Sequence, residues 1–209
     1  MNFDSYAVNC KKIKPYIMKK LFYYVLGFVA LISLNSCGYN TMVQLDEQVQ
    51  SQWAQVENVY QRRADLIPNL VASVKGAANF EQETLTKVIE ARAKATSVTV
   101  DPTKLTPEAI AKYQSAQGEL SQSLGRLMVV VEKYPELKAN QNFLELQSQI
   151  EGTENRISVE RQKFNSVTQE YNSKIRSFPN NLTAGMFGFS KKGYFQAEAG
   201  SNKPPKVEF

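Results

Sequence analysis

The stretch from Asn142 to Phe178, NFLELQSQIEGTENRISVERQKFNSVTQEYNSKIRSF, decides the fold because a large apolar residue returns every seven positions. A sustained seven-residue repeat is typical of helices that pack at a shallow crossing angle. We therefore predict one helix from about Glu136 to Ser177, ended by Phe178-Pro179, with the repeat in the core. The repeating residues are Phe143, Ile150, Ile157, Phe164, Tyr171 and Phe178, and parts of a second row are Leu146, Thr153 and Val167.

The preceding chain also shows helical periodicity. From about Asn40 to Ala78, apolar residues recur at steps of three and four, which places them on one face of a helix. Pro68 falls inside this pattern, so we expect a kink or a local break there. A second helix is predicted from about Glu81 to Thr96, with Asn79 as its cap. The apolar row of the first helix is Val49, Trp53, Val56, Tyr60, Ile67, Leu70 and Val74.

A third helix follows a loop rich in turn residues, Asp101 to Pro107. Thr106 is typical of an N-cap and Pro107 of a first helical position. The helix should end near Lys133-Tyr134-Pro135. Its apolar row is Ile110, Tyr113, Leu120, Leu124, Leu127 and Val131.

These patterns predict an all-α protein: a long antiparallel up-down-up-down four-helix bundle over residues 40–178. No segment alternates apolar and polar residues over strand length, so no sheet is expected. Residues 179–209 form a C-terminal tail that we expect to be partly disordered. The tail should lie near the membrane, and its aromatic residues could contact lipid, contact a partner or pack over the end of the bundle.

The N-terminus has the parts of a secretory signal. Lys19 and Lys20 precede an apolar run of 14 residues, Leu21 to Leu34, and Leu34-Asn35-Ser36-Cys37 resembles a bacterial lipobox. We expect residues 1–36 to be removed, Cys37 to receive a lipid, and residues 37–39 to form a tether. Met18 is the expected natural start, with a longer processed leader as the alternative.

A retained transmembrane helix is the other interpretation of this run. Fourteen helical residues span roughly 21 Å. The hydrocarbon core of a bilayer is about 30 Å thick and takes about 20 residues to cross. The length of the run favours a cleaved signal, so the expected location is a cell membrane or outer membrane, with the bundle outside the cytoplasm.

Charge and composition exclude several functions. Of 25 Lys and Arg and 20 Asp and Glu, five cations and one acid precede Cys37, so the remainder is nearly neutral. This balance predicts no nucleic-acid partner. The chain has no His and only two cysteines, Cys10 and Cys37. We therefore expect no metal site, no cofactor and no enzyme, although paired carboxylates or a Ser-Lys pair are not excluded by composition.

Several segments carry a resemblance to one known family. They are Arg62–Val71 with Lys75-Gly76, Ala91–Ala93, Tyr134–Ala139 with Phe143 and Leu146, Gly152–Ile157, and Arg161, Phe164-Asn165, Tyr171-Asn172, Ile175-Arg176 and Phe178-Pro179. Together they closely resemble the LemA family of bacterial envelope proteins, over about Tyr39 to Phe195. The resemblance implies an antiparallel helical bundle tethered to a membrane by its N-terminus, and it implies no established biochemical activity. Some relatives are associated with membrane proteases and envelope quality control. This sequence departs from the many relatives held by a transmembrane helix, because it carries a lipobox.

The cluster of Arg62, Arg63 and Asp65 beside Pro68 and Asn69 is the best candidate for an interaction site. A proline inside a helix frees a backbone carbonyl, which nearby polar side chains can bond. The structural interpretation pairs Asp65 with an arginine and lets Asn69 bond the broken turn. Three further amides, Asn155, Asn165 and Asn172, are predicted either to be buried and fix helix register or to be exposed.

We expect a membrane-tethered scaffold or adaptor that binds other envelope proteins. The alternatives are a bundle that binds a small ligand or lipid in an apolar cavity, and a hydrolase that needs neither His nor Cys. A cavity between helices would favour the first alternative, and a pocket with convergent titratable groups would favour the second.

Overall fold

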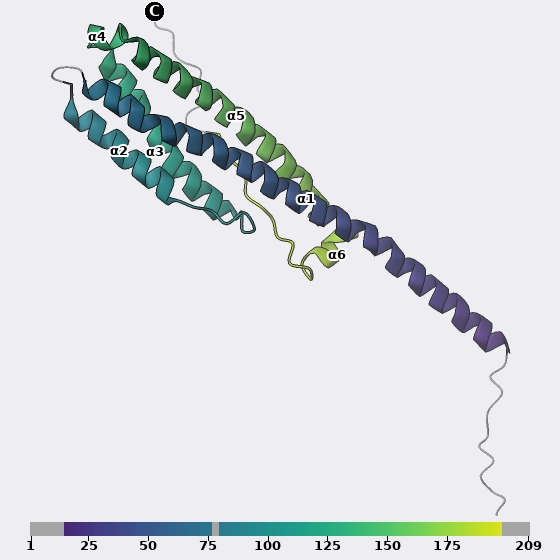
Figure 1. Ribbon diagram of the computed structural model, residues 1–209. Helices are drawn as coiled ribbons and strands as arrows, with labels where there is room; N and C mark the ends of the chain where they lie inside the picture. The colour runs from purple at the N-terminus through teal and green to yellow at the C-terminus, as the bar shows by residue number, and fades with distance from the viewer. Residues whose placement is uncertain (1–14, 77–79, 198–209) are drawn as a thin grey trace, which may run out of the picture. The chain divides into compact units, whose positions relative to one another are not determined.

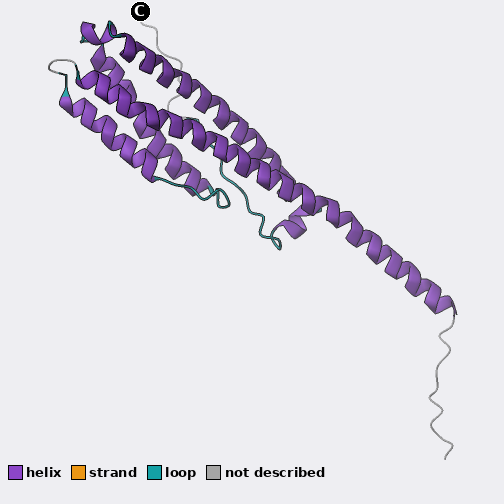
Figure 2. Ribbon diagram, viewed as in Figure 1, coloured by secondary structure: helices purple, strands orange, loops and turns teal. Residues whose placement is uncertain are grey.

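The computed structural model describes residues 15–76 and 80–197, and for residues 15–18 and 25–37 it describes the backbone alone. The chain divides into two compact units, Met1–Thr41 and Met42–Phe209. The described residues form six helices and no strand (Figure 1, Figure 2), so the all-α class is confirmed. The helices are α1 (Pro15–Lys75), α2 (Gln82–Ser97), α3 (Pro107–Val131), α4 (Pro135–Lys138), α5 (Gln141–Arg176) and α6 (Asn180–Ala184).

The first unit contains the start of α1. Leu21, Phe22, Tyr23 and Tyr24 are exposed there. Within the described residues, no helix combines the length and the apolar character that crossing a bilayer requires. The predicted signal peptide falls partly outside the described residues, and the side chain of Cys37 is not described. Cleavage and lipidation at Cys37 stay predictions.

In the second unit, two side-chain hydrogen bonds show the relative direction of the long helices α1 and α5. Gln52 of α1 donates to Glu160 of α5 at 2.6 Å, whereas Arg63, further along α1, bonds Glu154. The two helices are therefore antiparallel. Helix α2 packs against both neighbours: Lys94 bonds Glu119 of α3, and Arg92 bonds the backbone of α1.

The core of this unit consists of two apolar clusters. One contains α1 residues between Met42 and Tyr60, the start of α3 and the second half of α5, with Trp53, Tyr113 and Phe164 among its members. The other contains the end of α1, α2, the end of α3 and the start of α5. The predicted rows of the first and third helices are buried in full.

The seven-residue row of the last long helix is buried from Phe143 to Tyr171, but the prediction for Phe178 is wrong. Its side chain is 80% exposed. Helix α5 ends at Arg176, with Ser177 as its C-cap in extended geometry, so Phe178 leaves the helical register. The repeat therefore predicted the core only as far as the helix continues.

Two helix boundaries differ from prediction. The single helix expected from about Glu136 is divided into α4 and α5, because the Asn140 side chain accepts bonds from the backbone N–H groups of Asn142 and Phe143 and so starts a new helix. The N-cap of α2 is Glu81, which makes no side-chain cap bond, so the prediction that Asn79 caps it is wrong. Thr106 is confirmed as the N-cap of α3, where it accepts from the N–H of Ala109.

Helix α1 continues through Pro68. A proline at this position leaves the carbonyl four residues earlier, that of Ala64, without its helical partner. The Nε of Arg92 on α2 donates to this carbonyl at 2.8 Å. The neighbouring helix therefore supplies the bond that the proline removes, which explains why the helix is not interrupted there.

Candidate functional site

A buried arginine lies at the junction of the two apolar clusters. Arg63 is fully buried. Its Nη1 donates to Glu154 Oε2 at 2.7 Å and to Ser121 Oγ at 2.8 Å, and its Nη2 donates to Gln117 Oε1 at 2.8 Å. Its guanidinium also lies 5.1 Å from the centre of the Tyr60 ring. Arg63 thus joins α1, α3 and α5 in one polar layer, with charge-assisted bonds that are stronger than neutral ones.

The predicted cluster on α1 is only partly brought together. Arg62, Asp65, Pro68 and Asn69 are exposed, and only Arg63 enters the bundle. Asp65 accepts a bond from Gln61 at 2.8 Å, and the ion pair of Arg63 is made with Glu154, so the predicted pairing of Asp65 with an arginine is wrong. Arg92, rather than Asn69, bonds the turn at Pro68.

After α6 the chain returns along the bundle as an extended segment, residues 190–197, which we call the strap. Three side-chain amides each make two hydrogen bonds to one strap residue. Asn172 bonds both backbone groups of Lys192, and Asn165 bonds both backbone groups of Phe195. Gln114 of α3 does the same with Gln196. These amides pair with the strap backbone as a neighbouring β-strand would, so the interaction does not depend on the side chains of the strap.

Two strap side chains, Lys192 and Phe195, are nevertheless buried, and Phe195 is packed in the apolar core. Phe195 is 4% exposed, and its ring stacks on Trp53 with centres 5.9 Å apart and contacts Phe164 edge to face. Arg161 of α5 covers the ring at 5.1 Å and donates to the backbone carbonyl of Gln196 at 2.8 Å. Phe195 thus completes the core cluster that contains Trp53, Tyr113 and Phe164.

The strap approaches the start of α3 so closely that only glycine fits. A Cβ on Gly193 would lie 2.7 Å from Pro107 Cα and 3.0 Å from the carbonyl oxygen of Thr106. Both atoms belong to the backbone and cannot rotate away. The N–H of Gly193 donates to the carbonyl of Leu105 at 2.8 Å, which holds the two backbones together.

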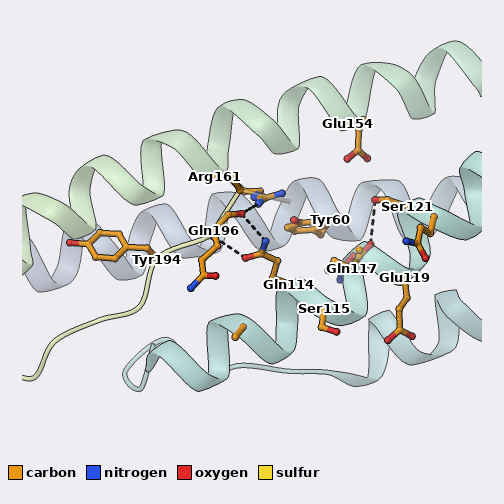
Figure 3. Close-up of a pocket in the computed structure, with 14 residues that line it drawn as sticks. Tyr60, Gln114, Ser115, Gln117, Glu119, Ser121, Glu154, Arg161, Tyr194 and Gln196 are labelled. Carbon is orange, nitrogen blue, oxygen red and sulfur yellow. Dashed lines mark hydrogen bonds between the residues drawn. The ribbon is translucent and has the colours of Figure 1, made fainter. Parts of the chain in front are cut away.

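An open groove begins where the strap ends. It has a volume of about 690 Å³ and lies between α3 and α5, with Tyr60 of α1 also in its lining (Figure 3). Arg161, Gln114 and Gln196 form its strap end, and Glu154 and Ser121 lie at the other end. The α3 wall includes Gly118, where a Cβ would meet nothing within 4 Å.

The groove offers hydrogen bonds from the neutral phenol of Tyr60 and from amides. Burial raises the pKa of Tyr60, an effect that the nearby Arg161 and Arg63 partly offset. Burial likewise raises the pKa of Tyr113 behind it. Both phenols therefore stay protonated at neutral pH. Among the described residues, no three His, Cys, Asp or Glu side chains lie together as metal ligands would. This arrangement suits the binding of a polar chain.

Sequence reasoning missed the strap and the groove. The sequence predicts either helix register or exposure for Asn165 and Asn172, whereas their amides hold the tail. Asn155, the third, is exposed. The spacing contained a usable signal, because Asn165 and Asn172 are seven residues apart and therefore lie on the same face of α5.

Comparison with known proteins gives one family. The family model described as LemA family matches residues 52–209. The chain is 28% identical over 201 residues to magnetosome protein MamQ 2 of Paramagnetospirillum magneticum, covering 86% of this chain and 72% of that protein. It is 26% identical over 193 residues to protein LemA of Metamycoplasma hominis, covering 90% of this chain and 84% of that protein. The magnetosome protein MamQ of Magnetospirillum gryphiswaldense is 26% identical over 201 residues, covering 86% of this chain and 72% of that protein.

Proposed function

Because the chain belongs to the LemA family, we propose that it is a lipid-anchored adaptor of the bacterial envelope whose groove between α3 and α5 binds extended segments of other proteins. The strap carries this proposal. It is an extended polypeptide held on this face of the bundle by amides that pair with its backbone. A surface that binds one extended chain in this way has the chemistry to bind another in line with it.

The shape of the groove favours a polypeptide over the alternatives. A bundle that stores a lipid or a small apolar ligand needs a largely enclosed apolar cavity. This groove is open along its length, and polar side chains such as Gln114, Gln122 and Arg161 supply much of its wall. A hydrolase would need a nucleophile beside a base. Instead, Glu154 is paired with Arg63, and Arg161 bonds the strap.

The proposed lipid anchor depends on the lipobox cysteine, Cys37. The second cysteine of the chain, Cys10, provides a matched control. We expect Cys37→Ala to abolish incorporation of radiolabelled palmitate, because the thiol is the acylated group. Cys10→Ala should leave incorporation unchanged, since Cys10 precedes the signal. The measurement is autoradiography of the immunoprecipitated protein. Label retained by the Cys37 variant, or lost from the Cys10 variant, would contradict the assignment.

The groove is tested by site-specific photocrosslinking in intact cells, with a benzophenone amino acid in place of Ser115, which lines the groove. We expect adducts with envelope proteins, identified by mass spectrometry. Filling the groove by Gly118→Leu should lower adduct yield at least about tenfold, which corresponds to about 1.4 kcal/mol of binding. The leucine fits on α3 without a clash, because nothing lies within 4 Å of the new Cβ.

Gly125→Leu is the matched control. Gly125 lies two turns further along α3 and is exposed, and a Cβ added there would also meet nothing within 4 Å. Both substitutions should favour the helix, because leucine has a higher helix propensity than glycine. Adduct yields that survive Gly118→Leu, or fall equally in both variants, would reject the groove as the binding site.

A further inference from the structure

The exposed apolar side chains of the bundle unit are concentrated at one place. Among the described residues of this unit, eight large hydrophobic side chains are exposed, and half of them lie within residues 178–187. They are Phe178, Leu182, Met186 and Phe187, with exposed fractions of 80%, 64%, 84% and 57%. The other four, Ile89, Val129, Leu144 and Val159, are scattered over α2, α3 and α5. A local concentration of this kind marks an interaction surface more often than single exposed residues do.

This apolar surface lies at the end of the bundle where the second unit begins. It is formed by α6 and its two flanking turns, directly after α5 (Figure 1). Ala184 of α6 is buried in the same core cluster as Met42, the first residue of the unit. Lys192, just beyond the surface, places its Nζ 2.7 Å from Asp46 Oδ1 of α1. The surface and the start of the bundle are therefore at the same end.

The chain length from Cys37 keeps this end near any lipid attached there. Met42 follows Cys37 by five residues. Even fully extended, five residues reach no more than about 18 Å. A lipid on Cys37 would thus keep the start of the bundle, and with it the α6 end, within about 18 Å of the lipidated residue.

The charge around the surface also suits a membrane. From Tyr171 to Ala197 the chain has four cations and no acid. Lys192 is buried and paired with Asp46, so the cations that can face an anionic bilayer are Lys174, Arg176 and Lys191. Of the acids on the facing part of α1, Asp46 is paired with Lys192, and Glu47 is exposed. Apolar side chains flanked by cations are the composition of segments that lie in the interface of anionic bilayers.

We propose that Phe178, Leu182, Met186 and Phe187 insert into the headgroup region of the anionic bilayer that carries the lipid anchor, so that the bundle is held at two points. This inference rests on the proposed lipid anchor at Cys37. The second contact fixes the orientation of the bundle, since a single lipidated residue would leave it free to swivel.

The experiment uses the mature lipoprotein, purified from cells and reconstituted into vesicles of phosphatidylcholine and phosphatidylglycerol. Cys10 and Cys37 are the only cysteines in the sequence. After cleavage and lipidation, an introduced cysteine is the only free thiol. A bimane fluorophore is placed at Met186→Cys, and in a second protein at Leu144→Cys, an exposed position at the start of α5. Nitroxide-bearing lipids quench a fluorophore that enters the bilayer.

We expect quenching of the Met186 label to exceed that of the Leu144 label at least about threefold, because interfacial segments bury their apolar face about 5–10 Å deep. Leu182→Asp combined with Phe178→Asp should lower quenching at Met186 to the Leu144 level. The matched pair, Leu144→Asp with Val159→Asp, should leave it unchanged. All four positions are exposed, so helical circular dichroism should be retained. Equal quenching of the two labels, or no response to the aspartates, would overturn the proposal.

Mass spectrometry of the same protein before labelling separates this inference from the anchor. A lipidated Cys37 with an unquenched Met186 label would reject the apolar surface and keep the anchor. An unmodified Cys37 with a quenched Met186 label would reject the anchor and keep the surface, because the Leu144 protein carries the same background label at Cys37.

Discussion

Replacing Arg63 by methionine is expected to lower the free energy of unfolding by about 3 kcal/mol, since removing one partner of a buried polar pair leaves the others unsatisfied. Methionine fills a similar volume but bonds none of the three partners. The side-chain oxygen of Gln117, which accepts from Arg63, would lose this donor inside the bundle. Glu154 is about half exposed and can be hydrated, which keeps the loss below that of a fully buried ion pair.

The measurement is urea unfolding followed by circular dichroism. The control is Arg62→Met, because Arg62 is the neighbouring residue, has the same side chain and is exposed. Substitutions at such positions usually change stability by less than about 0.5 kcal/mol. Arg63→Met combined with Gln117→Leu should recover part of the loss, since the second change removes the unpaired amide. Equal midpoints for Arg63→Met and Arg62→Met would contradict a structural role for the polar layer.

Replacing Phe195 by alanine is expected to release the strap and to destabilise the bundle by about 3 kcal/mol, in the range of buried phenylalanine truncations. The ring contacts Trp53 and Phe164 and lies under Arg161, so its loss opens one side of the core. The amide pairs alone do not compensate, because a typical hydrogen bond contributes only about 1 kcal/mol against the entropy of ordering the strap.

Hydrogen exchange is the direct measurement. The N–H groups of Lys192 and Phe195 donate to Asn172 and Asn165, and both should lose protection in the variant. Phe187→Ala is the control, because Phe187 is an aromatic residue of the same tail but is 57% exposed. Protection retained in Phe195→Ala would show that the amide pairs suffice to hold the strap.

The sequence allowed the helices and their buried faces to be predicted, because periodicity records which side of a helix meets the core. The burial of Arg63 could also have been predicted from periodicity. It follows Tyr60 by three residues and precedes Ile67 by four, so it occupies a position in the apolar row of α1. A charged residue at a core position requires buried partners, which points to a polar layer. Its partners on α3 and α5 depend on how the helices pack, which periodicity does not give.

The strap could not be predicted in the same way. Its residues show neither helical nor strand periodicity, since its backbone pairs with side chains and not with a regular element. Gly, Lys and polar residues are frequent in the tail, which is why the sequence predicts partial disorder. What orders its first part is a set of amides on α3 and α5, far away in sequence. The prediction for Phe178 failed for the opposite reason. The seven-residue repeat of the sequence continues for one step past Arg176, where α5 ends.

Because the amides bind the main chain of the strap, the strap can tolerate changes in its sequence. The backbone is common to all polypeptides, so most strap positions are free to vary without weakening the three amide pairs. The identities of three strap residues are constrained: Gly193 has no room for a Cβ, Phe195 fills the core, and Lys192 is buried and paired with Asp46. The other strap positions should therefore accept foreign residues, which would be displayed beside the groove while the fold is kept.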